Sequence, residues 1–96
     1  MKTLIIDCSD ISTEKELWQK YLDTVQPDGA EFFGKNLYAF RDAMTGGGPG
    51  WPGECILVFK GLGALKETLG ATFIESFTNI ARDSKDVKIK IDGNDL

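Results

Sequence analysis

The residues whose types could do chemistry are concentrated between positions 32 and 46, in the segment FFGKNLYAFRDAMTG. Much of this segment is predicted to be a helix, because its apolar residues recur at helical spacing. One face of that helix carries side chains at positions i, i+3, i+4 and i+7: Tyr38, Arg41, Asp42 and Thr45. A phenol, a guanidinium, a carboxylate and a hydroxyl on one stripe can bind polar and charged groups of a partner. A second stripe is predicted to face the core: Leu37, Phe40 and Met44, with Ala43 alongside.

Asp42 is the unusual member of this face. It falls within about the last turn of the predicted helix, where the helix dipole disfavours an anion by roughly 0.3–1 kcal/mol. Two interpretations stay open on the residues alone. Asp42 is either a solvated surface carboxylate or an acid aimed at positive charge on a partner.

Catalytic chemistry is not expected from this sequence. The chain contains no histidine, which is the usual general base and the commonest metal ligand in proteins. Its two cysteines, Cys8 and Cys55, have neither the spacing of a metal site nor a CxxC motif, and we expect them to be reduced thiols. We therefore predict no enzyme activity and no catalytic, cofactor-binding or metal-ligating residue.

The overall charge favours a basic partner. The 96 residues include 15 acids and 11 bases, a net charge of −4, whereas proteins that bind nucleic acid neutralise phosphates with Lys and Arg. Nucleic acid is therefore not expected to be the direct partner. The apolar runs at 4–6 and 55–59 are far shorter than the ~20 residues of a membrane span, and the first residues are too short a stretch for a signal peptide. We expect one cytoplasmic domain over residues 1–96 that contacts no membrane.

The elements that must position the 32–46 segment alternate between strands and helices. Strands are predicted over residues 2–7, 55–59 and 87–91. One helix is predicted to begin after Ser12 or Thr13, and three further helices are predicted over residues 36–44, 61–69 and 71–83. The order β-α-α-β-α-α-β predicts an α/β fold with a three-stranded parallel sheet and right-handed connections. Consecutive aliphatics at 4–6 predict a strand buried on both faces. The alternation V-K-I-K-I near the C-terminus predicts an edge strand with one face in water.

Four residues mark the ends of two of these helices. Thr13 and Glu16 have the spacing of a capping box at the start of the first helix. Asn36 is the predicted N-cap of the second helix, and Gly46 is its predicted stop.

Three aromatic residues invite a functional interpretation. Trp18 and Tyr21 could form a stacking platform for bases, but their helical register predicts core positions. Trp51 lies in the Gly/Pro-rich loop 46–53, where it either anchors a partner or folds back over the sheet. This loop follows a helix and precedes a strand, which is the wrong order for a phosphate-binding loop.

The segment FFGKNLYAFRDAMTG resembles the signature of the barstar family, in which an aromatic pair, Gly, Asn-Leu, an Asp and Thr-Gly occur at this spacing. A weaker similarity extends over nearly the whole chain. The resemblance implies a three-stranded parallel α/β protein that inhibits a ribonuclease inside the cell that produces it. It equally implies a bacterial immunity protein of a toxin–antitoxin pair, directed against a delivered ribonuclease toxin.

Carried over position by position, the resemblance implies a partner-binding face. Asp42 matches the acid that enters the nuclease active site, where the substrate phosphate would lie, and Phe32 matches an aromatic that packs on the catalytic region. Further interface positions are matched by Tyr38, Arg41, Thr45 and Gly46. A carboxylate held on a rigid helix would meet the cationic groups of such a site with charge-assisted hydrogen bonds.

Three positions depart from the family pattern. Tyr38 stands where the best-known member has a second acid, Arg41 replaces an aromatic, and Asn79 takes the place of an acid on the last long helix. Arg41 beside Asp42 would weaken attraction to a strongly cationic cleft. We therefore expect a target that differs from the family's familiar nuclease, or one that presents an acid opposite Arg41.

Three functional hypotheses follow. The first is an inhibitor or immunity protein, monomeric when free, that blocks a ribonuclease or ribonuclease toxin. The second is an interaction module of the same fold whose partner is not a nuclease. The third is a small-molecule or nucleotide binder that uses Gly61-Leu62-Gly63 after a strand, although the third glycine of a G-x-G-x-x-G motif would fall on Lys66.

Overall fold

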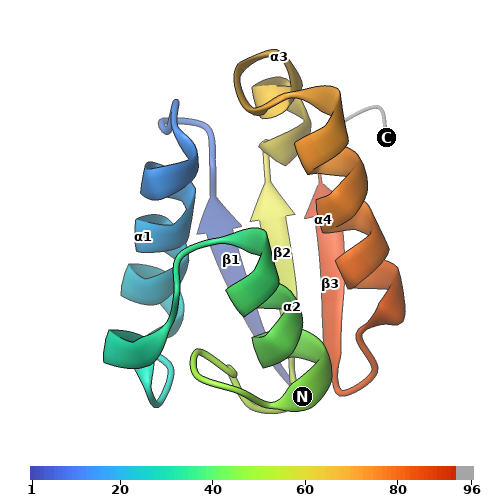
Figure 1. Ribbon diagram of the computed structural model, residues 1–96. Coiled ribbons are helices and arrows are strands. Elements are labelled where there is room, and N and C mark those ends of the chain that lie inside the picture. The colour runs from blue at the N-terminus through green and yellow to red at the C-terminus, as the bar shows by residue number, and fades with distance from the viewer. Residues whose placement is uncertain (93–96) are drawn as a thin grey trace.

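Helices cover one face of a small sheet in the computed structural model of the protein, which describes residues 1–92 (Figure 1). The last four residues of the predicted domain lie outside this range. The elements are β1 (Lys2–Asp7), α1 (Glu14–Val25), α2 (Leu37–Gly46), β2 (Cys55–Lys60), α3 (Lys66–Leu69), α4 (Ala71–Asp83) and β3 (Val87–Asp92). Their order confirms the predicted β-α-α-β-α-α-β arrangement and the α/β fold class.

The three strands are parallel and follow the order β1-β2-β3, with Lys2 opposite Cys55 and Cys55 opposite Val87. Both crossovers step in the same direction along the sheet. Because crossovers between parallel strands are right-handed as a rule, two such steps place all the intervening helices on the same side. Figure 1 shows this arrangement, with α1, α2 and α4 in front of the strands.

This one-sided covering overturns the prediction that β1 is buried on both faces. Ile6 is fully buried, whereas Ile5 is 57% exposed because its side chain points to the face of the sheet that lacks helices. Ile56 and Val58 in β2 are half-buried for the same reason. The prediction for β3 is confirmed: it is an edge strand, and Lys88 and Lys90 are exposed.

The helix ends follow the predicted caps, with one correction. The Thr13 hydroxyl accepts a hydrogen bond from the Glu16 amide at 3.1 Å, which confirms the capping box. The Asn36 side chain accepts one from the Ala39 amide at 2.7 Å, so Asn36 is the N-cap of α2. The predicted stop at Gly46 is one residue early. Gly47 adopts the left-handed conformation that ends the helix, with a φ of +72°.

The helix predicted at 61–69 is also corrected. Gly61 has a φ of +79° and is followed by a 3-10 helix, Leu62–Leu65, and then by the single turn of α3. Two glycines at its start weaken α-helix formation because glycine loses the most conformational freedom on folding. The segment is held instead by the buried side chains of Leu62 and Leu65.

An aromatic cluster forms the centre of the core. The ring centroid of Phe77 lies 5.0 Å from that of Phe40 and 4.9 Å from that of Phe59. Trp18 lies 5.2 Å from Phe40, and Tyr21 meets Phe40 edge to face at 5.7 Å. All five side chains are fully buried, so the prediction that Trp18 and Tyr21 are core residues is confirmed. The cluster joins α1, α2, β2 and α4 through direct contacts.

Both cysteines are buried free thiols, as predicted. None of the helices within residues 1–92 combines the length and the hydropathy that a membrane crossing requires.

We expect Phe77→Ala to lower the free energy of unfolding by roughly 3–5 kcal/mol, because it leaves a cavity between Phe40 and Phe59. Urea unfolding monitored by tryptophan fluorescence measures this change. Glu75→Ala, at an exposed position of the same helix, is the control and should change stability little. Equal effects of the two substitutions would contradict the central position of Phe77.

Candidate partner-binding site

The two predicted faces of α2 are confirmed. Its inner side chains are buried, those of Phe40, Ala43 and Met44. Its outer side chains are exposed, those of Tyr38, Arg41, Asp42 and Thr45. Tyr38 is 90% exposed, the highest value for any large apolar side chain in the described part of the chain. Contact between an aromatic ring and water is unfavourable, and a bound partner would remove this contact.

The carboxylate of Asp42 occupies a space that two glycines leave open. A Cβ on Gly46 would lie 3.2 Å from Asp42 Oδ1, and a Cβ on Gly48 would overlap Oδ2. Side chains at these two positions would therefore displace the carboxylate. Within residues 1–92 no hydrogen bond to the carboxylate is formed, although the backbone carbonyl of Asp42 accepts one from the Gly48 amide at 3.2 Å. The acid is held close to the helix end and its oxygens are available to a partner.

Arg41 is paired within the protein. Its Nη2 lies 2.8 Å from Oδ2 of Asp83 at the end of α4, and Arg82 Nε lies 3.6 Å from Oδ1 of the same carboxylate. The hydrogen bond from Arg41 holds the pKa of Asp83 below its ordinary value. The sequence led us to expect that a nuclease would supply the acid opposite Arg41. The structure shows instead that the chain supplies one itself, which offsets the positive charge beside Asp42.

A hollow of about 390 Å³ lies between α2 and α4. We call it the α2–α4 groove, and it is lined by Leu37, Tyr38, Arg41, Ser76, Asn79 and Ile80. Tyr38, Arg41 and Asn79, the three positions that depart from the family pattern, are thus brought together. Thr45 is one turn further along α2, where its hydroxyl donates a hydrogen bond to the Arg41 carbonyl at 2.7 Å.

The Gly/Pro-rich loop is pinned to the core rather than loosely attached. The buried Tyr21 hydroxyl donates a hydrogen bond to the Gly50 carbonyl at 2.6 Å. Burial raises the pKa of this phenol, so it remains a donor throughout the neutral range. Gly50 has a φ of +95°, and a Cβ there would come within 2.6 Å of the Phe33 ring. Only glycine fits this close approach, which fixes the path of the loop towards Trp51.

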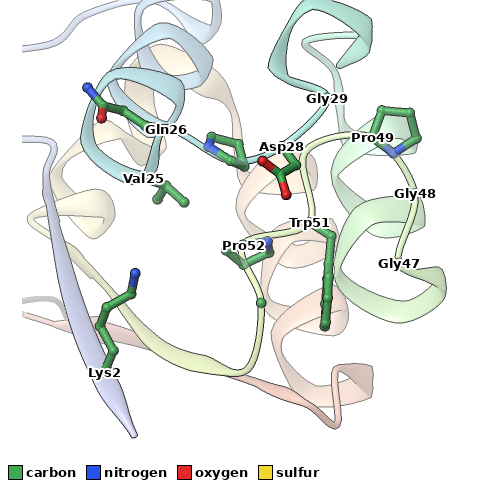
Figure 2. Close-up of a pocket in the computed structure, with 12 residues that line it drawn as sticks. Lys2, Val25, Gln26, Asp28, Gly29, Gly47, Gly48, Pro49, Trp51 and Pro52 are labelled. Carbon is green, nitrogen blue, oxygen red and sulfur yellow. The ribbon is translucent and has the colours of Figure 1, made fainter.

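Trp51 is 38% exposed and lines an open hollow of about 470 Å³ at the amino-terminal end of the sheet. Figure 2 shows its ring next to Pro52, with the Asp28 carboxylate directed into the same hollow. Gly47 and Gly48 line this hollow too, so it borders the space occupied by Asp42. The ring is neither buried against the sheet nor fully presented to solvent.

Phe32, the remaining predicted contact residue, lies in a 3-10 turn, Ala30–Phe32, and is 73% exposed. It is not among the residues that line either hollow. Its neighbour Phe33 faces inward and packs edge to face against Trp18 at 5.9 Å. The aromatic pair is therefore divided, with one ring in the core and one on the surface.

Three residues that shape this site carry no signal for that role in the sequence: Asp83, Gly48 and Tyr21. Asp83 neutralises Arg41 from another helix, and no spacing in the sequence indicates that α2 and α4 are neighbours. Gly48 belongs to a loop whose composition predicts flexibility, whereas its role is to leave room for Asp42. Tyr21 was assigned to the core, and its loop-binding hydroxyl carried no separate signal.

The other chemical candidates gain no support from their surroundings. Burial raises the pKa of the Cys8 thiol to about 12, which leaves little thiolate near neutral pH. Gly61-Leu62-Gly63 leads into a 3-10 helix whose side chains Leu62 and Leu65 are buried, not into a long helix whose amino end could bind phosphate. No group of three or more His, Cys, Asp or Glu side chains within residues 1–92 could hold a metal ion.

These features define a small α/β binding protein whose one-sided sheet presents an acid-bearing helix. Residues 1–92 match the family described as Barstar (barnase inhibitor), and the chain belongs to this family. The fold and the resemblance deduced from the sequence are thereby confirmed, and the family is one of inhibitors rather than enzymes. A search of curated proteins finds none that matches this sequence.

We expect Tyr21→Phe to destabilise the protein by about 1–3 kcal/mol, because the buried Gly50 carbonyl loses its donor. Amide exchange at Trp51, whose N–H bonds to the Gly48 carbonyl at 3.1 Å, should accelerate at the same time. Urea unfolding and NMR hydrogen exchange measure the two effects. Tyr38→Phe removes an exposed hydroxyl and is the matched control, expected to be neutral.

The pairing of Arg41 with Asp83 predicts a specific pH dependence. The Asp83 carboxyl should titrate below the ordinary value of about 3.9, and Arg41→Ala should move its midpoint back up. Since the folded-state pKa is lowered, the stability that the pair contributes is present above about pH 4 and is lost as pH falls through that pKa. Carbon-detected NMR titration of the side chain tests this. Lys35→Ala, which removes a charge elsewhere, should leave the midpoint unchanged, and an unshifted midpoint in Arg41→Ala would contradict the pairing.

Proposed function

We propose that this protein inhibits a ribonuclease, or a ribonuclease toxin, by seating the exposed face of α2 on its active site. One observation carries the proposal. Asp42 presents an exposed carboxylate, framed by Gly46 and Gly48 and without a hydrogen-bond partner in the described chain, on a helix that packs firmly against the core. In the complex this carboxylate would occupy the position of the substrate phosphate.

Electrostatic interactions of the Asp42 carboxylate favour the bound state over the free state. A ribonuclease gathers cationic donors around the phosphate of its substrate, and charge-assisted hydrogen bonds to a carboxylate are among the strongest available. In the free protein the same carboxylate lies near the negative end of the α2 dipole, an unfavourable position. A cationic site would offset this repulsion. The unfavourable interaction of Asp42 with the helix dipole in the free inhibitor would therefore be relieved on binding.

The long-range charge distribution supports the same partner. The net charge of −4 would attract a cationic cleft and accelerate association at low ionic strength. Because Asp83 offsets Arg41, the positive charge next to Asp42 opposes this attraction less than the sequence suggests.

Exposed aromatic rings on either side of Asp42 would supply the apolar part of the interface. Tyr38 precedes Asp42 by one turn of α2, Trp51 lies in the neighbouring loop, and Phe32 is exposed just before the helix. Aromatic residues of this kind are enriched among those that dominate binding energy. We propose that all three contact the nuclease, together with Thr45, Gly46 and Asn79. In this proposal the inhibitor is a monomer in the bacterial cytoplasm before it meets its target.

The test is inhibition of a panel of small microbial ribonucleases and toxin nuclease domains, led by any encoded beside this gene. We expect tight inhibition by the unchanged protein and a loss of roughly 30-fold or more with Asp42→Ala, the effect of a central interface residue. Gly48→Ala should also weaken inhibition because its methyl group would displace the carboxylate. Asp23→Ala, at an exposed site on α1, is the matched control.

Circular dichroism and urea unfolding separate binding from folding in this experiment. Asp42→Ala should unfold with a midpoint equal to that of the unchanged protein or slightly above it. Asp42 is exposed, makes no hydrogen bond through its side chain in the described structure, and lies near the negative end of the α2 dipole. Inhibition that is indifferent to Asp42→Ala would refute the proposed binding face. Absence of binding to every nuclease would favour an interaction module of the same fold, and stabilisation by nucleotides would favour the small-molecule hypothesis.

A further inference from the structure

We infer that the α2–α4 groove receives an uncharged, apolar side chain of the target nuclease and that this contact selects which nuclease is bound. The inference rests on the proposed function, because it assumes that the nuclease covers the exposed face of α2. It adds the chemistry of a second contact, separate from the acid. The groove is built from two helices, so its shape is set by helix packing rather than by a loop.

The groove has an apolar base and an aromatic rim. Ile80 is 3% exposed and Leu37 is half-buried, so hydrocarbon lies beneath the opening. Tyr38 borders the groove with its side chain almost entirely in solvent. Ser76 and Asn79 are the uncharged polar residues of the lining. An apolar side chain placed here would cover Ile80 and Leu37 and would remove part of the Tyr38 ring from water.

The charges around the groove disfavour a charged occupant. Arg41 is the one charged residue of the lining, and its partner Asp83 is already shared with Arg82. A cation from the nuclease would be repelled by Arg41, and none of the residues that line the groove carries a carboxylate that could bind it. An anion at Arg41 would lie beside the Asp83 carboxylate, which is held at 2.8 Å from Nη2 and would repel a second negative charge. An uncharged side chain meets neither obstacle. The Arg41–Asp83 pair therefore disfavours nucleases that would place a charged side chain in the groove.

The groove lies on the same surface as Asp42. Tyr38 and Asp42 are four residues apart on α2 and therefore project from the same side of the helix. A nuclease that places its phosphate site over Asp42 would bring the adjoining part of its surface over Tyr38. The acid can serve any cationic phosphate site, whereas the groove accepts only a nuclease with an apolar side chain at that distance. Specificity would therefore arise in the groove.

Small probes test the groove in the free protein. In heteronuclear NMR titrations, indole should shift the signals of Leu37, Asn79 and Ile80 saturably, whereas acetate and methylguanidinium should not. Ser76→Phe, which fills the groove, should abolish the effect of indole, and Thr72→Phe at an exposed site of the same helix should preserve it. Absence of an indole effect, or a stronger effect of either ion, would overturn the inference.

The nuclease that is inhibited through Asp42 tests the same groove in the complex. We expect Tyr38→Ala and Ser76→Phe to weaken inhibition by tenfold or more, and Thr72→Phe, at an exposed position outside the groove, to leave it within about twofold. Urea unfolding of each variant confirms that it folds. If Asp42→Ala abolishes inhibition while Tyr38→Ala and Ser76→Phe do not, the groove inference is overturned and the proposed function stands. If no nuclease is inhibited, the proposed function fails, and with it the nuclease as the occupant of the groove, even where indole binds.

Discussion

The packing of Phe40 against Phe77 is the contact on which the rest of the structure depends. It joins α2 to α4 at the centre of the aromatic cluster and fixes how α2 is rotated about its own axis. With Phe40, Ala43 and Met44 facing inward, Tyr38, Arg41 and Asp42 have to face outward. The direction of the proposed binding face is thus a consequence of core packing, and the same contact sets the spacing of the two walls of the α2–α4 groove.

A second constraint comes from glycines whose lack of a side chain leaves room for neighbouring groups. Gly50 admits the Phe33 ring, while Gly46 and Gly48 admit the Asp42 carboxylate. The Tyr21 hydroxyl then ties the loop to the core. A segment with the composition of a flexible linker is therefore held in one path by specific contacts, and this path keeps the loop backbone near Asp42 without covering its oxygens.

Electrostatic balance distinguishes this surface from a simple acidic one. Asp42 is left without a side-chain hydrogen bond in the described chain, whereas Arg41 is satisfied by Asp83. Within the described residues Asp42 thus has an unpaired carboxylate, while the nearby cation is paired. In the proposed complex this arrangement would combine an acid that suits any phosphate-binding site with a neighbouring groove that suits uncharged groups, and it would separate affinity from selectivity on one helix face.

The sequence by itself determined the order of the elements, the caps at Thr13 and Asn36, the two faces of α2 and the family, because these depend on periodicity and on local side-chain hydrogen bonds. Only the tertiary structure decided that one face of the sheet lacks helices, which leaves Ile5 exposed although its neighbours predict burial. It also decided the partner of Arg41 and the place of Trp51. These features join residues far apart in the chain, such as Arg41 and Asp83 or Tyr21 and Gly50. Local patterns carry no information about such contacts, because they exist only once the helices have packed on the sheet.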